Sequence, residues 1–308
     1  MALNQVAQES IKTVYMTASE ELLKGEAVLI NGCKTNLTGE NARIGDTIEV
    51  TIDPDLNVYD WDGGAMPIIQ TPQDTKVKIA IDKAKYARVK INSADFALLN
   101  GKSGTQEEQL SAQGRFGKRI AYKMVVAKEQ EVAGLYARAG LGVSYGAGTC
   151  SDSNPIQANE NNAEQIIANI ANTFNNNLVS TSMNKINVYI PPSFATLLGF
   201  QSGNDNTAEG RTERLGRFVA KRNNMNIYES NFLTSTAVDG GVGYRILAFV
   251  DKEAILFGQN REIFDDIVID IVNDGVDRQL KCTAIYGAGV YRADKVLTLT
   301  AVCDNLAM

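Results

Sequence analysis

Apolar residues recur at every second position within three runs of residues 46–91. The apolar positions form three runs: Ile48, Val50 and Ile52; Val77, Ile79 and Ile81; and Ala87, Val89 and Ile91. Alternation with a period of two residues is typical of half-buried β-strands. Two turn-forming sequences, Asp53-Pro54-Asp55 and Asp62-Gly63-Gly64, separate the first run from the second. We therefore expect an extended β-hairpin over residues 46–91.

The two strands of this hairpin carry opposite charges. The acidic side chains of the first stretch, which has no Lys or Arg, are Asp46, Glu49, Asp53, Asp55, Asp60, Asp62 and Asp74. The basic side chains of the second stretch, against a single Asp82, are Lys76, Lys78, Lys83, Lys85, Arg88 and Lys90. Such strands can pair with each other or with a neighbouring copy of the chain. This favours a subunit built for repeated contact over a solitary enzyme.

We take ten hairpin residues as candidate contacts between subunits. They are Asp53, Asp55, Asp60, Trp61, Asp62, Lys76, Lys78, Lys83, Lys85 and Arg88. Trp61 is the only tryptophan of the chain. It has two interpretations: a residue packed under its own loop, or an anchor in another chain, since aromatic residues are enriched at interface hot spots.

A long helix is predicted over residues 107–139. Its apolar positions, three or four residues apart, are Phe116, Ile120, Met124, Ala127, Glu131 or Val132, Leu135 and Ala139. Glu107 and Glu108 begin it, where the helix dipole favours acidic side chains. At about 1.5 Å per residue the helix is a rod of roughly 50 Å. Four cations in its first half, Arg115, Lys118, Arg119 and Lys123, form either a solvated face or a weak contact surface.

The rest of the chain predicts an α+β fold without internal repeats. Residues 1–45 are polar, with a short helix at 19–24, and we expect them to contribute little core. Residues 140–162 are a loop rich in Gly, Ser and Asn. The predicted helices are 163–178, with Leu178 on its apolar face, and 193–198, and the predicted strands are 186–190, 225–229, 245–251, 254–258, 263–272, 276–286, 289–292 and 296–302.

Composition and charge narrow the class of protein. The 308 residues are 44% hydrophobic and 21% charged, as in ordinary globular proteins, and carry a formal charge of −6. A net acidic chain argues against a general duplex-binding surface, which requires a basic face. No apolar run is long enough to span a bilayer, and residues 1–31 lack a signal-peptide pattern, so we expect no membrane contact and a cytoplasmic location.

We find no catalytic, cofactor or metal motif in the sequence. The chain has no histidine, and its cysteines, Cys33, Cys150, Cys282 and Cys303, show no C-x-x-C spacing, so buried reduced thiols are favoured over zinc ligands or disulfides. Asp265, Asp266 and Asp270 form the densest acidic cluster, either a solvated strand face or a calcium or magnesium site. A histidine-free hydrolase would need a Ser–Lys pair or two carboxylates.

The order of these segments resembles the major capsid (coat) proteins of tailed bacteriophages, over nearly the whole chain. Five short sequences carry the resemblance: Gly45-Asp46-Thr47-Ile48; Lys85-Tyr86-Ala87-Arg88-Val89-Lys90-Ile91 before the long helix; Val188-Tyr189-Ile190-Pro191-Pro192; Arg222-Asn223-Asn224-Met225-Asn226-Ile227-Tyr228-Glu229-Ser230-Asn231; and Ala284-Ile285-Tyr286-Gly287-Ala288-Gly289-Val290-Tyr291-Arg292. Each is weak alone, and their order makes the case.

The resemblance implies an N-terminal arm (1–45), an extended loop (46–91) lying over a neighbouring subunit, a spine-helix region of a peripheral domain (92–139), an axial domain (140–274) and C-terminal strands of the peripheral domain (275–308). It implies self-assembly as pentamers and hexamers into an icosahedral head shell around double-stranded DNA, which the shell contacts weakly and non-specifically. A separate scaffolding protein, a portal and decoration proteins are the other expected partners. No cofactor or catalysis is implied, and the location is the virion, assembled in the host cytoplasm. The alternative within this fold is an encapsulin-like cellular nanocompartment shell.

Overall fold

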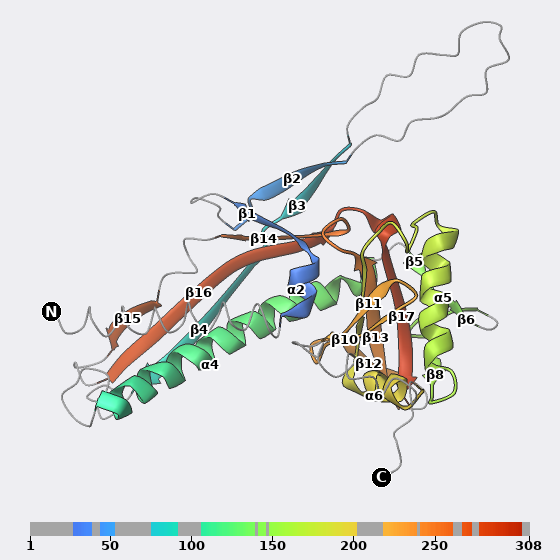
Figure 1. Ribbon diagram of the computed structural model, residues 1–308. Coiled ribbons are helices and arrows are strands. Elements are labelled where there is room, and N and C mark those ends of the chain that lie inside the picture. The colour runs from blue at the N-terminus through green and yellow to red at the C-terminus, as the bar shows by residue number, and fades with distance from the viewer. Residues whose placement is uncertain are drawn as a thin grey trace, which may run out of the picture.

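The computed structural model describes residues 27–38, 44–52, 75–91, 106–138, 141–145, 148–201, 218–238, 241–260, 267–272 and 277–303. It confirms the α+β fold, with an elongated part and a compact part (Figure 1). In the elongated part a long helix lies along a long strand. In the compact part helices pack against a wide sheet.

Strand β16 (Asp277–Val290) is the centre of the elongated five-stranded sheet. β4 (Lys83–Ile91) pairs along one edge of β16, while β15 (Ile267–Val272) and β14 (Ile255–Asn260) pair in succession along the other. β1 (Lys34–Thr38) runs parallel to β14. The prediction of two strands, 276–286 and 289–292, is wrong, because the backbone stays extended and paired through both glycines of the sequence Tyr286-Gly287-Ala288-Gly289.

The long helix predicted over 107–139 is confirmed as α4 (Gln106–Ala133), continued by the 3₁₀-helix η1 (Gly134–Arg138). Ile120, Met124 and Leu135 are buried as expected. Lys118, Arg119 and Lys123 are exposed, which is compatible with both a solvated face and a contact surface, whereas the side chain of Arg115 lies outside the described part. The helix therefore packs one apolar face against the rest of the chain.

Two charged residues of α4, Lys128 and Glu129, are fully buried, which the apolar pattern did not predict. The carboxylate of Glu129 accepts the backbone N–H groups of Leu29 (3.2 Å) and Ile30 (2.9 Å). The Lys128 ammonium donates to the side-chain oxygen of Gln259 (3.1 Å). Buried charges require such partners, because an unpaired charge away from water is strongly unfavourable.

The residues that Glu129 contacts belong to α2 (Val28–Gly32), which packs against α4. Ala27 and Leu29 are fully buried here. The expectation that residues 1–45 contribute little core is thus wrong for α2, whose short apolar sequence packs beside α4. Glu129 accepts hydrogen bonds from two N–H groups in the first turn of α2, which have no partner within the helix. The predicted helix at 19–24 lies outside the described residues.

The compact part contains an eight-stranded sheet. The strand order is β10 (Phe218–Arg222), β11 (Met225–Glu229), β9 (Ile186–Ile190), β13 (Gly241–Val250), β17 (Val296–Cys303) and β5 (Leu141–Gly142), with β12 (Ser235–Val238) on β13 and β8 (Ile156–Ala158) on β17. A short pair, β6 (Ser144–Tyr145) with β7 (Gly148–Thr149), stands apart from this sheet. The expectation that residues 140–162 form only a loop is therefore wrong, because β5 and β8 extend the sheet by pairing with β17.

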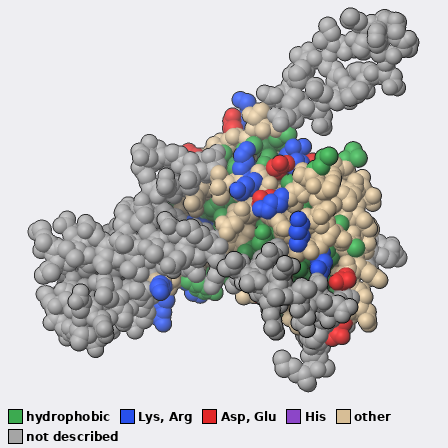
Figure 2. Space-filling view, viewed as in Figure 1, with side chains coloured by type: hydrophobic (Ala, Val, Ile, Leu, Met, Phe, Trp, Pro, Cys, Tyr) green, Lys and Arg blue, Asp and Glu red, His purple; other side chains and the backbone are tan. Residues whose placement is uncertain are grey.

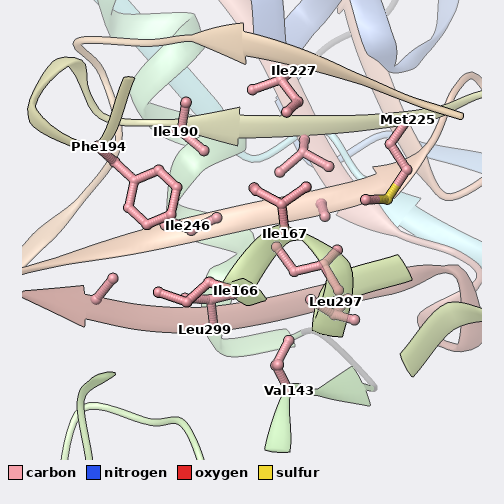
Figure 3. Packing of buried hydrophobic residues seen from close by; sticks show 14 of the residues in the cluster. Val143, Ile166, Ile167, Ile190, Phe194, Met225, Ile227, Ile246, Leu297 and Leu299 are labelled. Atoms are coloured by element: carbon pink, nitrogen blue, oxygen red, sulfur yellow. The ribbon is translucent and has the colours of Figure 1, made fainter. Parts of the chain in front are cut away.

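The central strand β9 of the eight-stranded sheet is buried on both faces. On one face, Val188 and Ile190 of β9 pack with α5 (Ala163–Asn176) and α6 (Pro192–Gln201), as Figure 3 shows for part of this cluster. On the other face, Tyr189 packs with residues of α2 and α4. Burial on both faces explains why residues 186–190 are apolar except for Asn187 and do not alternate with exposed polar residues.

The helices predicted over 163–178 and 193–198 are confirmed as α5 and α6, with one correction at the end of α5. Leu178 lies outside the helix, has a positive φ of 61° and is 94% exposed. The strand before Pro191 ends as expected, and Pro192 occupies the first position of α6, where its missing N–H is not needed.

Candidate assembly surface

The hairpin predicted from the alternation is present as β2 (Thr47–Ile52) paired antiparallel with β3 (Thr75–Ala80). Its apolar face rests on the elongated sheet, where a small cluster joins the hairpin side chains to Leu256 of β14 and Ile285 of β16. The buried hairpin residues of this cluster are Ile48, Val50, Ile79 and Ile81. Two further backbone hydrogen bonds, Gly45 N to Ile81 O (2.9 Å) and Ile81 N to Asp46 O (2.8 Å), close the base of the hairpin.

Opposite charges meet across the hairpin within one chain. The Lys78 ammonium lies 2.9 Å from the Glu49 carboxylate, and that of Lys76 lies 3.9 Å from it. The hydrogen bond and charge of Lys78 lower the pKa of Glu49, and the same contact raises the pKa of Lys78. All three side chains are exposed, so the pairs contribute little to stability. The pairs nevertheless hold these charged side chains close together on the exposed face of the hairpin.

The other candidate contact residues are placed differently. Lys83 lies 3.5 Å from Asp82 and 3.8 Å from Glu131 of α4, so it joins β4 to the long helix. Lys85 is exposed on β4. The backbone of Arg88 pairs with Lys281, but its side chain lies outside the described part. The remaining candidates also lie outside the described residues: Asp53, Asp55, Asp60, Trp61 and Asp62.

The hairpin crosses the elongated sheet at two glycines that the sequence reasoning did not treat as site residues. A Cβ atom on Gly287 would lie 2.3 Å from the backbone oxygen of Ala80 and 2.9 Å from Cα of Ile81. A Cβ on Gly289 would lie 2.9 Å from the side chain of Ile79. The strand pairing and the missing side chains together let one backbone pass close over the other. The available signal was the unusual pair of glycines inside an otherwise strand-like run.

A hydrogen-bonded network joins the end of the long helix to the compact part. Arg245 of β13 donates to Asp152 through Nη2 (2.5 Å) and Nε (3.2 Å), and Thr300 of β17 donates to the same carboxylate (2.8 Å). Tyr136 of η1 is hydrogen-bonded to Thr300 (2.6 Å), and the Arg245 guanidinium lies 5.0 Å from the centre of its ring. The hydrogen bonds from Arg245 lower the pKa of Asp152, while burial raises the pKa of Tyr136.

The described residues offer little for catalysis or metal binding. Within them no group of three or more acidic or cysteine side chains is arranged to hold a metal ion. Cys33, Cys150 and Cys303 are buried, as predicted, and burial raises the pKa of the Cys33 thiol, while the side chain of Cys282 lies outside the described part. Among the described helices none is long and apolar enough to cross a membrane.

One hollow of about 280 Å³ opens between α5, α6 and the β10–β11 turn. Its floor is apolar, formed by Ile167, Ala168 and Leu198, and Glu164 and Arg222 lie at 3.9 Å from each other on its rim. The Glu164–Arg222 pair is partly exposed, which is typical of a surface ion pair. The hollow therefore gives no reason to assign a reaction.

The described parts are a long sheet backed by a helix, a compact unit built on a second sheet, and a hairpin that rests on the long sheet. The chain is similar to a structure from Mycobacterium phage Che8, with a TM-score of 0.62 and 15% identity over 89% of this chain and 91% of that one. The capsid structure of cyanophage P-SCSP1u gives 0.58 and 14% identity over 91% and 90% of the two chains.

A virus-like particle from Pyrococcus furiosus is also similar, with a TM-score of 0.50 and 10% identity over 94% of this chain and 98% of that one. No protein-family model and no curated protein sequence matches the chain. At these identities the likeness shows the fold, and the chain has the fold of tailed-phage capsid proteins. This confirms the fold class that the order of short sequences predicted.

Proposed function

We propose that this chain is the major capsid protein of a tailed bacteriophage. Copies assemble as pentamers and hexamers into an icosahedral head shell that encloses double-stranded DNA. The observation that carries the proposal is a fold likeness spanning both chains almost end to end, 89% of this chain and 91% of the Che8 chain. In this role the protein is structural rather than catalytic, needs no cofactor, and resides in the virion after assembly in the host cytoplasm.

The two parts of the molecule correspond in this proposal to the domains of a shell subunit. The elongated sheet and α4 are the peripheral domain, and the compact part is the axial domain facing the five-fold and six-fold vertices. In this proposal β14, within 140–274, would belong to the peripheral domain because it joins the elongated sheet, and β17, within 275–308, would belong to the axial domain because it joins the compact one. The strands β2 and β3, which rise from the elongated sheet in Figure 1, carry the extended loop proposed to lie over the neighbouring subunit, whereas β4, expected within that loop, pairs with β16 in the sheet.

The partners follow from the same role. The first is the chain itself, and the others are a separate scaffolding protein, a portal and decoration proteins. Contact with the packaged DNA is weak and non-specific, which the net charge of −6 supports, since strong phosphate binding needs a basic surface. The alternative is an encapsulin-like nanocompartment shell, and the similarity to the Pyrococcus furiosus virus-like particle does not favour it over the phage shell.

Negative-stain electron microscopy with sedimentation velocity tests the proposal. Purified protein, alone and mixed with lysate of infected host cells, is expected to give closed polyhedral shells or tubes of uniform size. Double-stranded DNA in particles isolated from the producing cells supports the phage shell, whereas a protein cargo supports the nanocompartment. Protein that remains monomeric under both conditions contradicts both shell assignments.

The role of the hairpin charges is tested by reversing Lys76, Lys78 and Lys85 to Glu together. We expect a lower particle yield with unchanged solubility of the subunit, because these exposed lysines are proposed to contact a neighbouring subunit in the shell. The cross-strand pair with Glu49 calls for a second variant, K78E combined with E49K, which restores the ion pair within one hairpin. If the K78E/E49K double variant assembles normally while K78E does not, the charges stabilise the hairpin and do not contact the neighbouring subunit.

Deletion of residues 53–74 tests the proposed reach of the extended loop. The shortened subunit is expected to fold, because the described hairpin residues of the apolar cluster, Ile48, Val50, Ile79 and Ile81, lie outside the deletion. It is expected to form no closed shells. Circular dichroism and thermal unfolding check the fold, and electron microscopy checks assembly. Normal particles from the folded deletion variant would show that the loop is not an assembly contact.

A further inference from the structure

The loop between α5 and β9, residues 177–185, exposes two large apolar side chains. Leu178 is 94% exposed and Met183 is 90% exposed. Single exposed apolar residues are ordinary on protein surfaces, so exposure by itself assigns no role. The backbone of this loop supplies the additional observation.

Leu178 occupies a position that favours glycine. It follows the last capping residue of α5, Asn177, with a left-handed φ of 61°. The turn is closed by hydrogen bonds from Leu178 N to Asn175 O (3.1 Å) and from Val179 N to Phe174 O (2.9 Å). Glycine is the usual residue here because a Cβ atom strains the left-handed conformation. The chain keeps a leucine whose side chain contributes no packing within one copy.

The loop is also held in one shape before any partner arrives. Thr181 N donates to the side chain of Asn175 (3.0 Å), and Asn184 donates twice to Ser180 O, from its backbone (3.0 Å) and its side chain (2.9 Å). Val179 is buried beneath the loop. A preorganised loop loses little conformational freedom when it binds, so its apolar side chains are effective contacts.

Charged residues of both signs lie at the C-terminal end of this loop. Asp251 donates its backbone N–H to Lys185 O (2.8 Å) and accepts the Lys185 ammonium (3.0 Å). Beyond it, Lys295 pairs with Glu253. Figure 2 shows hydrophobic side chains projecting over the end of α5, close to side chains of both charges. An apolar centre with a polar rim is typical of protein interfaces, and paired charges of both signs do not select a nucleic acid.

We propose that the loop of residues 177–185 is a contact between copies of this chain, in which Leu178 and Met183 pack against an apolar surface of a second copy. The inference rests on the proposed shell function, which supplies the second copy. The hairpin β2–β3, proposed to reach a neighbour, rises from the same side of the molecule as the end of α5 in Figure 1. Both features would then face the same adjoining subunit.

The test uses the full chain with L178E and M183E, singly and together. Val242, which is 52% exposed, provides the matched control V242E, adding the same charge to another exposed apolar residue. We expect each loop variant to fold normally and to lower the association constant of the subunits about tenfold or more, as for interface hot spots. The control is expected to assemble as the wild type does.

A photo-reactive amino acid at position 183 gives a second readout. In assembled particles it is expected to cross-link to another copy of the chain, identified by mass spectrometry. If wild-type particles form, yet the double variant assembles normally and no cross-link between copies appears, the loop contact is refuted while the shell function stands. A cross-link to a different protein also refutes it. Failure of the wild type to assemble at all contradicts the shell function instead.

Discussion

Replacing Gly287 with Ala tests the close crossing of the hairpin over β16. The new Cβ atom would lie 2.3 Å from the backbone oxygen of Ala80, well inside the 3.4 Å at which ordinary contact begins, so the two backbones must move apart. The obstacle is main chain and cannot rotate away. Such a shift pulls the hairpin side chains Ile48, Val50 and Ile79 from their cluster on the sheet.

The expected cost is about 1–3 kcal/mol, the usual range for overpacking a filled interior. Since every 1.4 kcal/mol is a factor of ten, the equilibrium constant for detaching the hairpin should rise roughly 5- to 150-fold. The change should be local, because α4 and the compact part do not depend on this contact. Shell yield should fall with it, if the hairpin reaches the neighbouring subunit.

Hydrogen exchange followed by mass spectrometry measures the effect. Peptides covering residues 44–52 and 75–81 should exchange faster, since the hydrogen bond from Ile81 N to Asp46 O opens with the hairpin. Gly134→Ala is the matched control, because a Cβ at Gly134 meets nothing within 4 Å. Exchange in the hairpin that is identical for the two variants would refute the steric argument.

Three further substitutions test the interior and the loop. Glu129→Ala leaves two buried N–H groups without their acceptor and should lower the free energy of unfolding by about 2–5 kcal/mol, measured by urea denaturation; a loss below about 1 kcal/mol would contradict this. Asp152→Asn removes the partner of Arg245. Because the folded pKa of Asp152 is lowered, its stabilisation is present above the ordinary pKa of 3.8 and fades as pH falls below that value, so the gap between wild type and variant should close in acid; a gap unchanged at about pH 3 would refute the ionic role. Leu178→Gly should raise the free energy of unfolding by about 0.5–1 kcal/mol through relief of left-handed strain, while weakening assembly; lower stability would show that the leucine serves the fold of a single copy.

Local periodicity in the sequence was enough to determine most of the secondary structure. The two-residue alternation predicted β2 and β3, and the three-to-four-residue spacing predicted α4 and α5, because each pattern reflects which side of a strand or helix is buried. The order of short sequences also indicated the fold class. The pairing of Lys76 and Lys78 with Glu49 within one chain followed from the charge split, although the sequence left a neighbouring copy equally open.

Only the tertiary structure showed where these elements meet. Glu129 accepts a hydrogen bond from Leu29, 100 positions away in the sequence. No local sequence pattern indicates so distant a partner, so the sequence alone assigns the buried helix α2 to a polar arm. Leu178 fits the apolar spacing of α5, yet the helix ends two residues earlier and turns the side chain into water. Gly287 appeared to interrupt a strand, whereas it permits a crossing that exists only when the hairpin folds back. Periodicity fixes which face of an element is buried, while the identity of what covers that face depends on the whole chain.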